Sequence, residues 1–238
     1  LTVQTTDGTL TDTDTVALTV DPVADIADDS ATTDEDTAVT IPVLGNDTFE
    51  GSPVITSVDG QAIAVGGSVT VAGGTVTLNA GGTLTFTPTA DSNGPTPFTY
   101  TVSSGGVTET ATVDVTVTPV NDAPVNTVPG AQSTNEDTPL AIGGVTVADI
   151  DTGTLTTTVS VTNGTLAVTT GTGATLGGNG TSTVTLTGTA AQINAALAGL
   201  TYTNTADYNG GAVLTVQTTD GTLTDTDTVA LTVDPVAD

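Results

Sequence analysis

Val115–Pro139, VTVTPVNDAPVNTVPGAQSTNEDTP, is the stretch of sequence that decides the fold. Valine and threonine alternate up to Pro119, as is typical of a β-strand with one face in a core. The pair Asn121–Asp122 follows, and the acidic triplet 135–137 (NED) precedes the next alternating run. The stretch therefore predicts the end of one β-domain, a short acidic linker and the beginning of a second β-domain.

Alternating segments separated by turns rich in Gly, Asn and Asp occur on both sides of this junction. Before it, the candidate strands are 38–44, 53–58, 68–71, 75–78, 83–87, 98–102 and 107–118. After it, they are 140–147, 155–161, 165–169, 183–187, 200–203, 213–218 and 228–233. Many short strands at this spacing predict an all-β protein of two β-sandwich domains, residues 25–121 and 122–238.

Thr189–Leu200, TAAQINAALAGL, departs from the alternating pattern. Thr189 is a suitable N-cap, and Ile193, Leu197 and Leu200 share one face at helical spacing. Gly199 is the expected end of the helix. We therefore predict one short helix in the second domain, with its apolar face in the core.

Residues Leu1–Asp25 recur without change as Leu214–Asp238. Identity over such a length indicates a tandem array. Within each copy, two alternating runs flank an Asp-Gly turn, which predicts a hairpin with strands at 1–5 and 16–20 in the first copy. We expect residues 1–24 to be the C-terminal hairpin of a preceding repeat. Its edges would need a partner, either an upstream segment or a neighbouring molecule.

The composition restricts the possible partners. The 238 residues include 27 acidic residues and no Lys, Arg or His, giving a formal charge of −27. Phosphate binding depends on Lys and Arg, so nucleic acid is excluded, and an anionic membrane surface is equally unsuited. Only cations from solution can relieve the repulsion among these carboxylates, although the acidity could also serve solubility alone. Cysteine is absent, so no disulfide stabilises the domains.

An enzymatic role is not expected. Without His, Lys, Arg or Cys the chain lacks the usual bases, thiolates and oxyanion-binding side chains. A carboxylate pair could hydrolyse glycosides, but three Tyr and three Phe are too few to line a sugar-binding cleft. The sequence has no apolar run long enough for a transmembrane helix, and it begins within a predicted strand. Any targeting signal is therefore expected elsewhere in a longer chain.

Carboxylates crowded at a domain junction suggest calcium, which takes six to eight hard oxygen ligands. Asp149 and Asp151 are the best candidate pair, because alternate residues leaving a strand share a face. A glycine-rich run at 177–180 has no following Asp and does not repeat, so a calcium β-roll is not predicted.

Several motifs together resemble a known group of proteins. They are DEDTAVTIPVLGNDT at 34–48, GGTLTFTPTADSNGPTPFTYTVSSG at 81–105, VTVTPVNDAP at 115–124, NEDTPL at 135–140 and VADIDTG at 147–153. The chain resembles the bacterial Ig-like and cadherin-like tandem repeats of giant RTX-type and biofilm-associated adhesins. The resemblance implies an extracellular, cell-surface location, tandem extension and Ca²⁺ between domains.

The resemblance also implies a set of calcium ligands. In the cadherin-type joint, a Glu near the domain start, a DxD pair and an acidic linker hold the ion. The first domain has no DxD pair, and Asp47 is the expected substitute. The residues expected to bind Ca²⁺ are Asp21, Asp25, Glu35, Asp47, Asn121, Asp122, Glu136, Asp149, Asp151 and Asp234.

These observations predict a structural extender repeat of a large extracellular adhesin, rigidified by calcium between its domains. Its partners would be adjacent copies of the same repeat. One alternative is a self-assembling fibre or surface-layer subunit, in which the N-terminal hairpin completes a neighbour's sheet. Another is a calcium-dependent carbohydrate-binding module, which the scarcity of aromatic residues disfavours.

Overall fold

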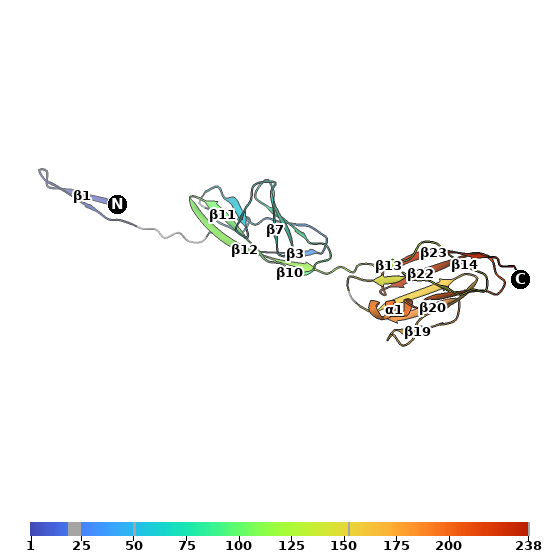
Figure 1. Ribbon diagram of the computed structural model, residues 1–238. Coiled ribbons are helices and arrows are strands. Elements are labelled where there is room, and N and C mark those ends of the chain that lie inside the picture. The colour runs from blue at the N-terminus through green and yellow to red at the C-terminus, as the bar shows by residue number, and fades with distance from the viewer. Residues whose placement is uncertain (19–24, 50, 152, 238) are drawn as a thin grey trace. The chain divides into compact units, whose positions relative to one another are not determined.

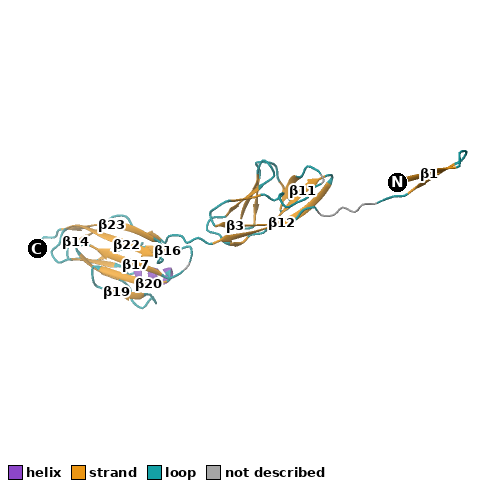
Figure 2. Ribbon diagram, turned by 180° about the vertical axis from the view of Figure 1, so that it is seen from behind, coloured by secondary structure: helices purple, strands orange, loops and turns teal. Residues whose placement is uncertain are grey.

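The computed structural model describes residues 1–18, 25–49, 51–151 and 153–237 (Figure 1). The chain divides into two compact units, Leu1–Val120 and Asn121–Asp238. The first unit holds a hairpin within residues 1–18 and a β-sandwich from residue 25 onward, here called domain A. The second unit is domain B. Strands dominate both units in Figure 2, which confirms the all-β class with one short helix in the described part of domain B.

Domain A is a sandwich of two sheets. One sheet has the strand order β10-β12-β11-β5-β6, with β3 also paired to β12, and the other has the order β4-β9-β8-β7. The strands are β3 (Asp29–Asp34), β4 (Val39–Ile41), β5 (Val54–Val58), β6 (Gln61–Ala62), β7 (Ser68–Val71), β8 (Gly74–Leu78), β9 (Leu84–Pro88), β10 (Gly94–Pro95), β11 (Phe98–Ser104) and β12 (Val107–Thr118). Alternate residues of β12 face the core, where the rings of Phe86 and Phe98 stack with centroids 6.1 Å apart.

Domain B contains a larger sheet with the order β14-β23-β22-β17-β20-β19, a sheet β15-β21-β18 and the pair β13-β16. Its strands are β13 (Val125–Thr127), β14 (Gln132–Asn135), β15 (Leu140–Ala141), β16 (Thr146–Ala148), β17 (Leu155–Val161), β18 (Gly164–Ala167), β19 (Thr175–Gly177), β20 (Thr183–Gly188), β21 (Thr201–Asn204), β22 (Gly210–Thr219) and β23 (Thr224–Asp234). The predicted strand 140–147 is in fact two strands. Gly143 and Gly144 separate them, and Gly144 has a φ of 81° that other residues rarely adopt.

In both domains the first strand of the larger sheet pairs in parallel with the last strand. In domain A, β3 runs beside β12, and in domain B, β14 runs beside β23. Sequence analysis missed β3 and β14, because their sequences DSATTD and QSTN lack an apolar alternation. Their pairing depends on the strand at the other end of the domain, which no local pattern reports.

The predicted helix is present as α1 (Ala190–Leu197). Thr189 and Gln192 form a capping box, which confirms the predicted N-cap. Ile193 and Leu197 lie in the core of domain B, as predicted. The helix ends at Ala198 rather than at Gly199. Glycine is required at 199 for a different reason, since a Cβ there would collide with Thr169 Oγ1.

The N-terminal hairpin consists of β1 (Thr2–Thr6) and β2 (Thr11–Thr15). The second strand lies earlier than the predicted 16–20. Residues 16–18 form no strand, and 19–20 lie outside the described residues. Every residue from 1 to 18 is exposed. In the described ranges of the whole chain, no helix has the length and apolar character needed to span a membrane.

Candidate metal-binding clusters

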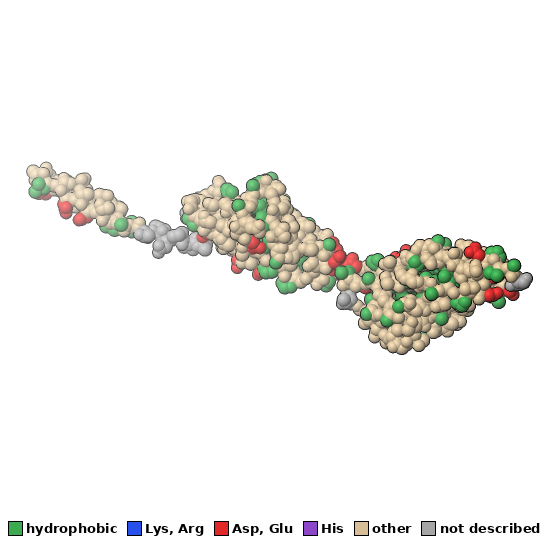
Figure 3. Space-filling model, viewed as in Figure 1, with side chains coloured by type: hydrophobic (Ala, Val, Ile, Leu, Met, Phe, Trp, Pro, Cys, Tyr) green, Lys and Arg blue, Asp and Glu red, His purple; other side chains and the backbone are tan. Residues whose placement is uncertain are grey.

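Acidic side chains gather near the ends of both sandwich domains on the face drawn in Figure 3. The strands of a sandwich begin and end at its two ends, here called poles, so residues far apart in the sequence meet there. Each pole described below consists of residues of a single domain.

Glu35 organises the C-terminal pole of domain A. It directly follows β3, and its backbone N–H donates to the carbonyl of Thr118 at 2.9 Å, which continues the parallel pairing with β12. The Glu35 side chain is only 4% exposed. Its Oε1 accepts the Val120 N–H at 2.6 Å, and its Oε2 accepts from Asn93 Nδ2 at 3.4 Å. A buried carboxylate thus holds the segment that leaves the domain.

Asp36 and Asp91 lie at the same pole and face each other. The Asp91 N–H donates to Asp36 Oδ1 at 3.2 Å, and one carboxylate oxygen of each lies within 4.8 Å of the other. Both residues have positive φ, 59° and 54°, a conformation that Asp tolerates better than most residues. Two carboxylates at this distance repel each other, and the chain has no Lys, Arg or His to neutralise them.

Domain B repeats this arrangement at its own C-terminal pole. Glu136 is 7% exposed, and its N–H donates to the Asp234 carbonyl at 2.9 Å. Its Oε1 accepts the Val236 N–H at 2.6 Å, and its Oε2 accepts from Asn209 Nδ2 at 3.3 Å. The predicted ligand Asp234 takes part through its backbone, while its side chain is exposed.

The second acidic pair also recurs in domain B. The Asp207 N–H donates to Asp137 Oδ1 at 3.3 Å, and the two residues have φ values of 56° and 55°. We call Glu35, Asp36, Asp91 and Asn93 the A cluster, and Glu136, Asp137, Asp207 and Asn209 the B cluster. Two domains with different sequences and different numbers of strands therefore build the same constellation.

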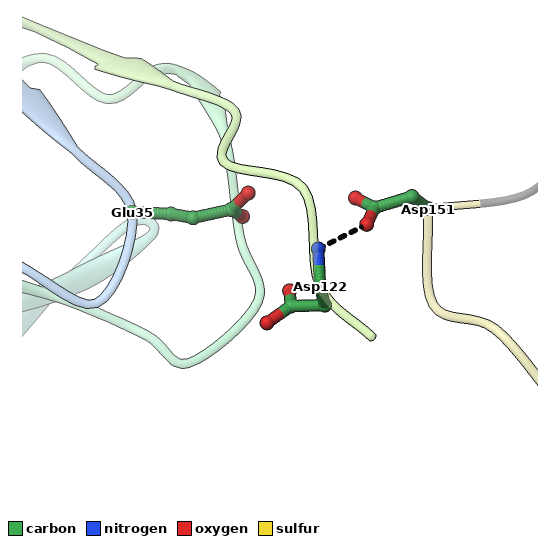
Figure 4. A group of neighbouring side chains, drawn as sticks. All are labelled: Glu35, Asp122 and Asp151. Atoms are coloured by element: carbon green, nitrogen blue, oxygen red, sulfur yellow. Dashed lines mark hydrogen bonds between the residues drawn. The ribbon is translucent and has the colours of Figure 1, made fainter. Parts of the chain in front are cut away.

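Asp122, Asp149 and Asp151 meet at the N-terminal pole of domain B. The Asp122 N–H donates to Asp151 Oδ2 at 2.7 Å (Figure 4), and these two carboxylates also have oxygens within 4.8 Å of each other. The Asp151 N–H donates to Asp149 Oδ1 at 2.9 Å. The other oxygen, Asp149 Oδ2, is buried and has no hydrogen-bond partner among the described residues.

The position of the DxD pair has a different cause from the one expected. Strand β16 ends at Ala148, before the pair begins. An Asx turn, in which the side chain of Asp149 accepts the N–H two residues later, therefore positions Asp149 and Asp151. Strand alternation is not what brings them together.

Asn121 and Asp220 join the linker to the hairpin of domain B. Asn121 Nδ2 donates to Asp220 Oδ2 at 2.6 Å. This hydrogen bond, together with those from the N–H groups of Leu223 and Thr222, holds the pKa of Asp220 below its usual value. Strand β23 itself is also bonded to the start of the domain, because the Asn126 N–H donates to Asp225 Oδ2 at 2.7 Å.

The N-terminal pole of domain A uses Asp47 in a comparable way. Asp47 Oδ1 accepts the Ala27 N–H at 2.8 Å, and Asp47 Oδ2 is buried without a hydrogen-bond partner in the described part of the chain. Burial raises the pKa of the nearby Asp29, which accepts a hydrogen bond from Tyr100. The backbone N–H of Asp25 donates to Glu109 Oε2 at 3.1 Å.

The structure thus distributes the predicted ligands over separate poles. Asp122, Asp149 and Asp151 meet at one pole, Glu35 and Glu136 organise two others, and Asp21 lies outside the described residues. The ligand set predicted from the sequence does not contain the following residues: Asp36, Asp91, Asn93, Asp137, Asp207, Asn209 and Asp220. A usable signal was present, because EDT recurs after the first strand of the larger sheet in each domain, and ADSNG recurs as ADYNG.

The fold and these poles can be compared with known proteins. Residues 20–116 match a family described as a bacterial Ig domain. The chain contains an Ig-like repeat. Such repeats are typically exposed at the bacterial cell surface and are generally structural or adhesive rather than catalytic. None of the curated proteins compared with the chain matches it.

Solved structures with similar architecture include the extracellular cadherin domains 1–5 of protocadherin gamma B2. It is 17% identical, with a TM-score of 0.42, over 90% of this chain and 39% of that one. The Ig1+Ig2 fragment of DIP-gamma is 12% identical over 89% of this chain and 96% of that one, with a TM-score of 0.37. The insect immune protein hemolin is 14% identical over 94% and 49%, with a TM-score of 0.35. This chain therefore spans well under half of the protocadherin fragment.

Proposed function

We propose that this chain is a structural extender repeat of a large extracellular bacterial adhesin, and that calcium bound between consecutive domains makes the repeats rigid. Its role is mechanical, because it separates a distant binding module from the cell surface. Ig-like repeats belong to the structural and adhesive class, which supports the general role. Calcium binding between domains and a place in a large adhesin go beyond this general role, and they are what we propose.

The recurrence of the A and B clusters is the observation that supports the proposal most strongly. Each cluster has a buried Glu that holds the exit segment, and a second pair of Asp side chains beside it. Burying a carboxylate is unfavourable unless hydrogen bonds or a cation compensate. Two domains of different topology would have little reason to share such a cluster for solubility alone.

Chain connectivity supports a shared ion between domains A and B. Val120, whose N–H is bound by Glu35, precedes Asp122 by two residues. A chain of that length spans at most about 7 Å. Asp122 is therefore tied by the chain itself to the segment that Glu35 holds, and an ion bound by Asp122 would lie close to that segment.

The chemistry of the donors favours calcium. All the candidate donors are carboxylate, amide or backbone oxygens, which suit a hard cation with a flexible coordination sphere of six to eight ligands. The unpartnered oxygens of Asp149 and Asp47 add capacity to accept such an ion. The sequence contains no His or Cys, so it offers none of the softer ligands that zinc and copper prefer.

The test compares Glu35→Gln with Glu136→Gln in the full chain. Each substitution removes one charge and keeps an oxygen that can accept the Val120 or Val236 N–H. Calcium titration by calorimetry and NMR relaxation should show that the two domains tumble together in millimolar Ca²⁺ and separately in EDTA. In the Glu35→Gln variant, the calcium concentration at which the two domains begin to tumble together should be at least tenfold higher.

Glu136→Gln is the matched control, since Glu136 holds Val236 in the segment that leaves domain B, and not the segment that joins domains A and B along the chain. It should leave the coupling of domains A and B by calcium unchanged. Absence of calcium binding to the wild-type chain at millimolar concentration, or independent tumbling in its presence, would contradict the proposal.

A further inference from the structure

Three uncharged polar side chains lie together inside domain B, away from the acidic poles. Thr157 and Thr218 are 0% exposed, and Asn126 is 8% exposed. They come from three different strands, β17, β22 and β13. The core of this domain otherwise consists mostly of aliphatic residues. Burying polar groups in such a core is unfavourable unless they bond to one another, so their mutual contacts decide what the group can do.

The hydroxyl of Thr218 is at the centre of this group. Its Oγ1 donates to Asn126 Oδ1 at 2.6 Å, and it lies 3.0 Å from Thr157 Oγ1. A hydroxyl carries a single proton, which Thr218 gives to Asn126, so Thr157 is the donor of the second hydrogen bond. The amide nitrogen of Asn126 donates to the Val216 carbonyl at 3.4 Å. A buried hydroxyl oxygen is therefore held against a carboxamide, and a second hydroxyl donates to it.

A carboxylate lies beside the same group. Asp225 is the partner of Thr218 in the antiparallel ladder between β22 and β23. The Cβ atoms of residues paired in this way are about 5 Å apart. Asp225 Oδ2 also accepts the backbone N–H of Asn126 at 2.7 Å, so the carboxylate is bonded to the residue that carries the carboxamide. A hydroxyl, a carboxylate that can take its proton and a carbonyl carbon are the components of an acyl transfer.

We propose that Thr218 and Asn126 become joined by an intramolecular ester after domain B has folded. Thr218 Oγ1 attacks the side-chain carbonyl carbon Cγ of Asn126, and its proton passes to the Asp225 carboxylate. The tetrahedral intermediate then loses the amide nitrogen, which takes the proton from Asp225 and leaves as ammonia. One O–C bond forms, one C–N bond breaks, and no oxidant or other reactant is needed. The hydrogen-bonded pair is the state before this reaction.

The geometry of the hydrogen-bonded pair suits this reaction. An oxygen that bonds to a carbonyl oxygen at 2.6 Å lies about 3.4 Å from the carbonyl carbon, which is within the range of reacting groups poised for attack. Rotation of the Asn126 carboxamide about its Cβ–Cγ bond turns the face of the carbon toward the hydroxyl. Groups held in this way react as if at an effective concentration of about 10⁵ M or more. Ammonia is lost to solution, and burial keeps water from the ester.

The position of the bond gives it a mechanical consequence. Asn126 belongs to β13 near the start of domain B, and Thr218 belongs to β22 near its end, 92 residues later. A covalent link between them keeps the intervening chain from extending when the two ends of the domain are pulled. No disulfide can do this, because the chain has no cysteine. The inference concerns domain B alone and does not depend on calcium or on an adhesin role.

The test is a peptide map of the full chain after days at neutral pH. A protease that cleaves after Asp and Glu is used, since there is no Lys or Arg for trypsin. It places Asn126 in peptide 123–136 and Thr218 in peptide 208–220. Mass spectrometry should find these peptides joined, with the summed mass less one ammonia, and mild alkali should separate them. A chain kept unfolded in urea should give separate peptides. Separate peptides from the folded wild-type chain would overturn the proposal.

Two matched variants identify the attacking hydroxyl. Thr218→Val has the same shape without the hydroxyl, so it should give no joined peptides. Thr157→Val removes the neighbouring hydroxyl and keeps Thr218, so the link should still form. Peptide 123–136 joined instead to peptide 152–207, which contains Thr157, would overturn the assignment to Thr218. The wild-type and Thr157→Val maps decide the matter even where Thr218→Val prevents folding.

The role of Asp225 is tested by the rate of joining. Asp225→Asn keeps an oxygen that can accept the Asn126 N–H, but it removes the group that takes the proton. Joining should become slower by about 100-fold or more, since a general base commonly contributes that much. NMR dispersion of domain B shows whether the variant is folded. An unchanged rate in a folded Asp225→Asn chain would contradict the role of this carboxylate.

Discussion

One hairpin sequence adopts two different structures in this molecule. In domain B the shared sequence forms strand over residues 214–219, within β22, and over Thr224–Asp234, which is β23. In the N-terminal hairpin the strands span five residues each. The turn is nearly the same in both, with Asp7 or Asp220 accepting the N–H groups of the residues two and three positions later.

This difference separates local from tertiary contributions. The turn forms wherever the sequence occurs, because an Asp side chain and a glycine with positive φ are sufficient for it. In domain B the second strand continues through residues 229–231, which pair with residues 212–214 of β22 and place Val229 and Leu231 in the core, whereas the equivalent residues 16–18 form no strand. An isolated two-stranded hairpin is marginal in water, and additional strands or packing stabilise it.

The largest expected effect on stability comes from truncating one core leucine in each copy. Leu231→Ala removes a side chain that is 2% exposed, and its equivalent Leu18 is 74% exposed. Leu231→Ala should lower the free energy of unfolding of domain B by about 2–5 kcal/mol. Leu18→Ala should change the unfolding of either domain by less than about 0.5 kcal/mol. Urea unfolding of the full chain measures both, and equal effects would show that the first hairpin is also packed in solution.

A smaller effect is expected from the buried threonine of the same hairpin. Thr218→Val leaves Asn126 Oδ1 without its donor in the core, and should destabilise domain B by about 1–3 kcal/mol. Thr5→Val at the exposed equivalent should be neutral or nearly so. Thermal unfolding distinguishes the two variants. A neutral Thr218→Val would mean that the buried hydroxyl contributes no net stability and does not help to set the register.

The smallest effect concerns pH at the two turns. Hydrogen bonds from the Leu10 and Thr9 N–H groups lower the pKa of Asp7 to about 2. The pKa of Asp220 is also lowered, first of all by the Asn121 side chain. Since the folded value is below the unfolded one, Asp220 stabilises domain B above about pH 4, and this contribution is lost as the pH falls through the folded value.

Asp220→Asn should therefore make the stability of domain B less dependent on pH in the acidic range. Asp7→Asn should leave it unchanged, because the first hairpin is not part of either sandwich. Unfolding curves at a series of acidic pH values test this difference, and carboxyl NMR titration should place the pKa of Asp7 near 2. A pH dependence of the Asp220→Asn chain that equals that of the wild type would contradict the assignment.

Much of the fold could be predicted from local patterns. The alternation in 107–118 and 155–161 gave the two strands with their observed bounds, and Thr189 correctly marked the start of α1. The first strands of the two larger sheets, β3 and β14, could not be found in this way, because their polar sequences lie as strands beside β12 and β23. The same limit applied to the A and B clusters. Glu35 and Glu136 were recognisable, but Asp91 and Asp207 join Asp36 and Asp137 from loops more than 50 residues away.

The sequence by itself determined the all-β class, the absence of any cationic side chain and the repetition of one hairpin, because these depend on composition, short-range alternation and identity. Only the tertiary structure decided which strands the second copy of the hairpin pairs with, and which carboxylates share a pole. The physical reason is that partner strands, burial and the distance between like charges arise from segments remote in sequence, which are brought together when the sandwich closes.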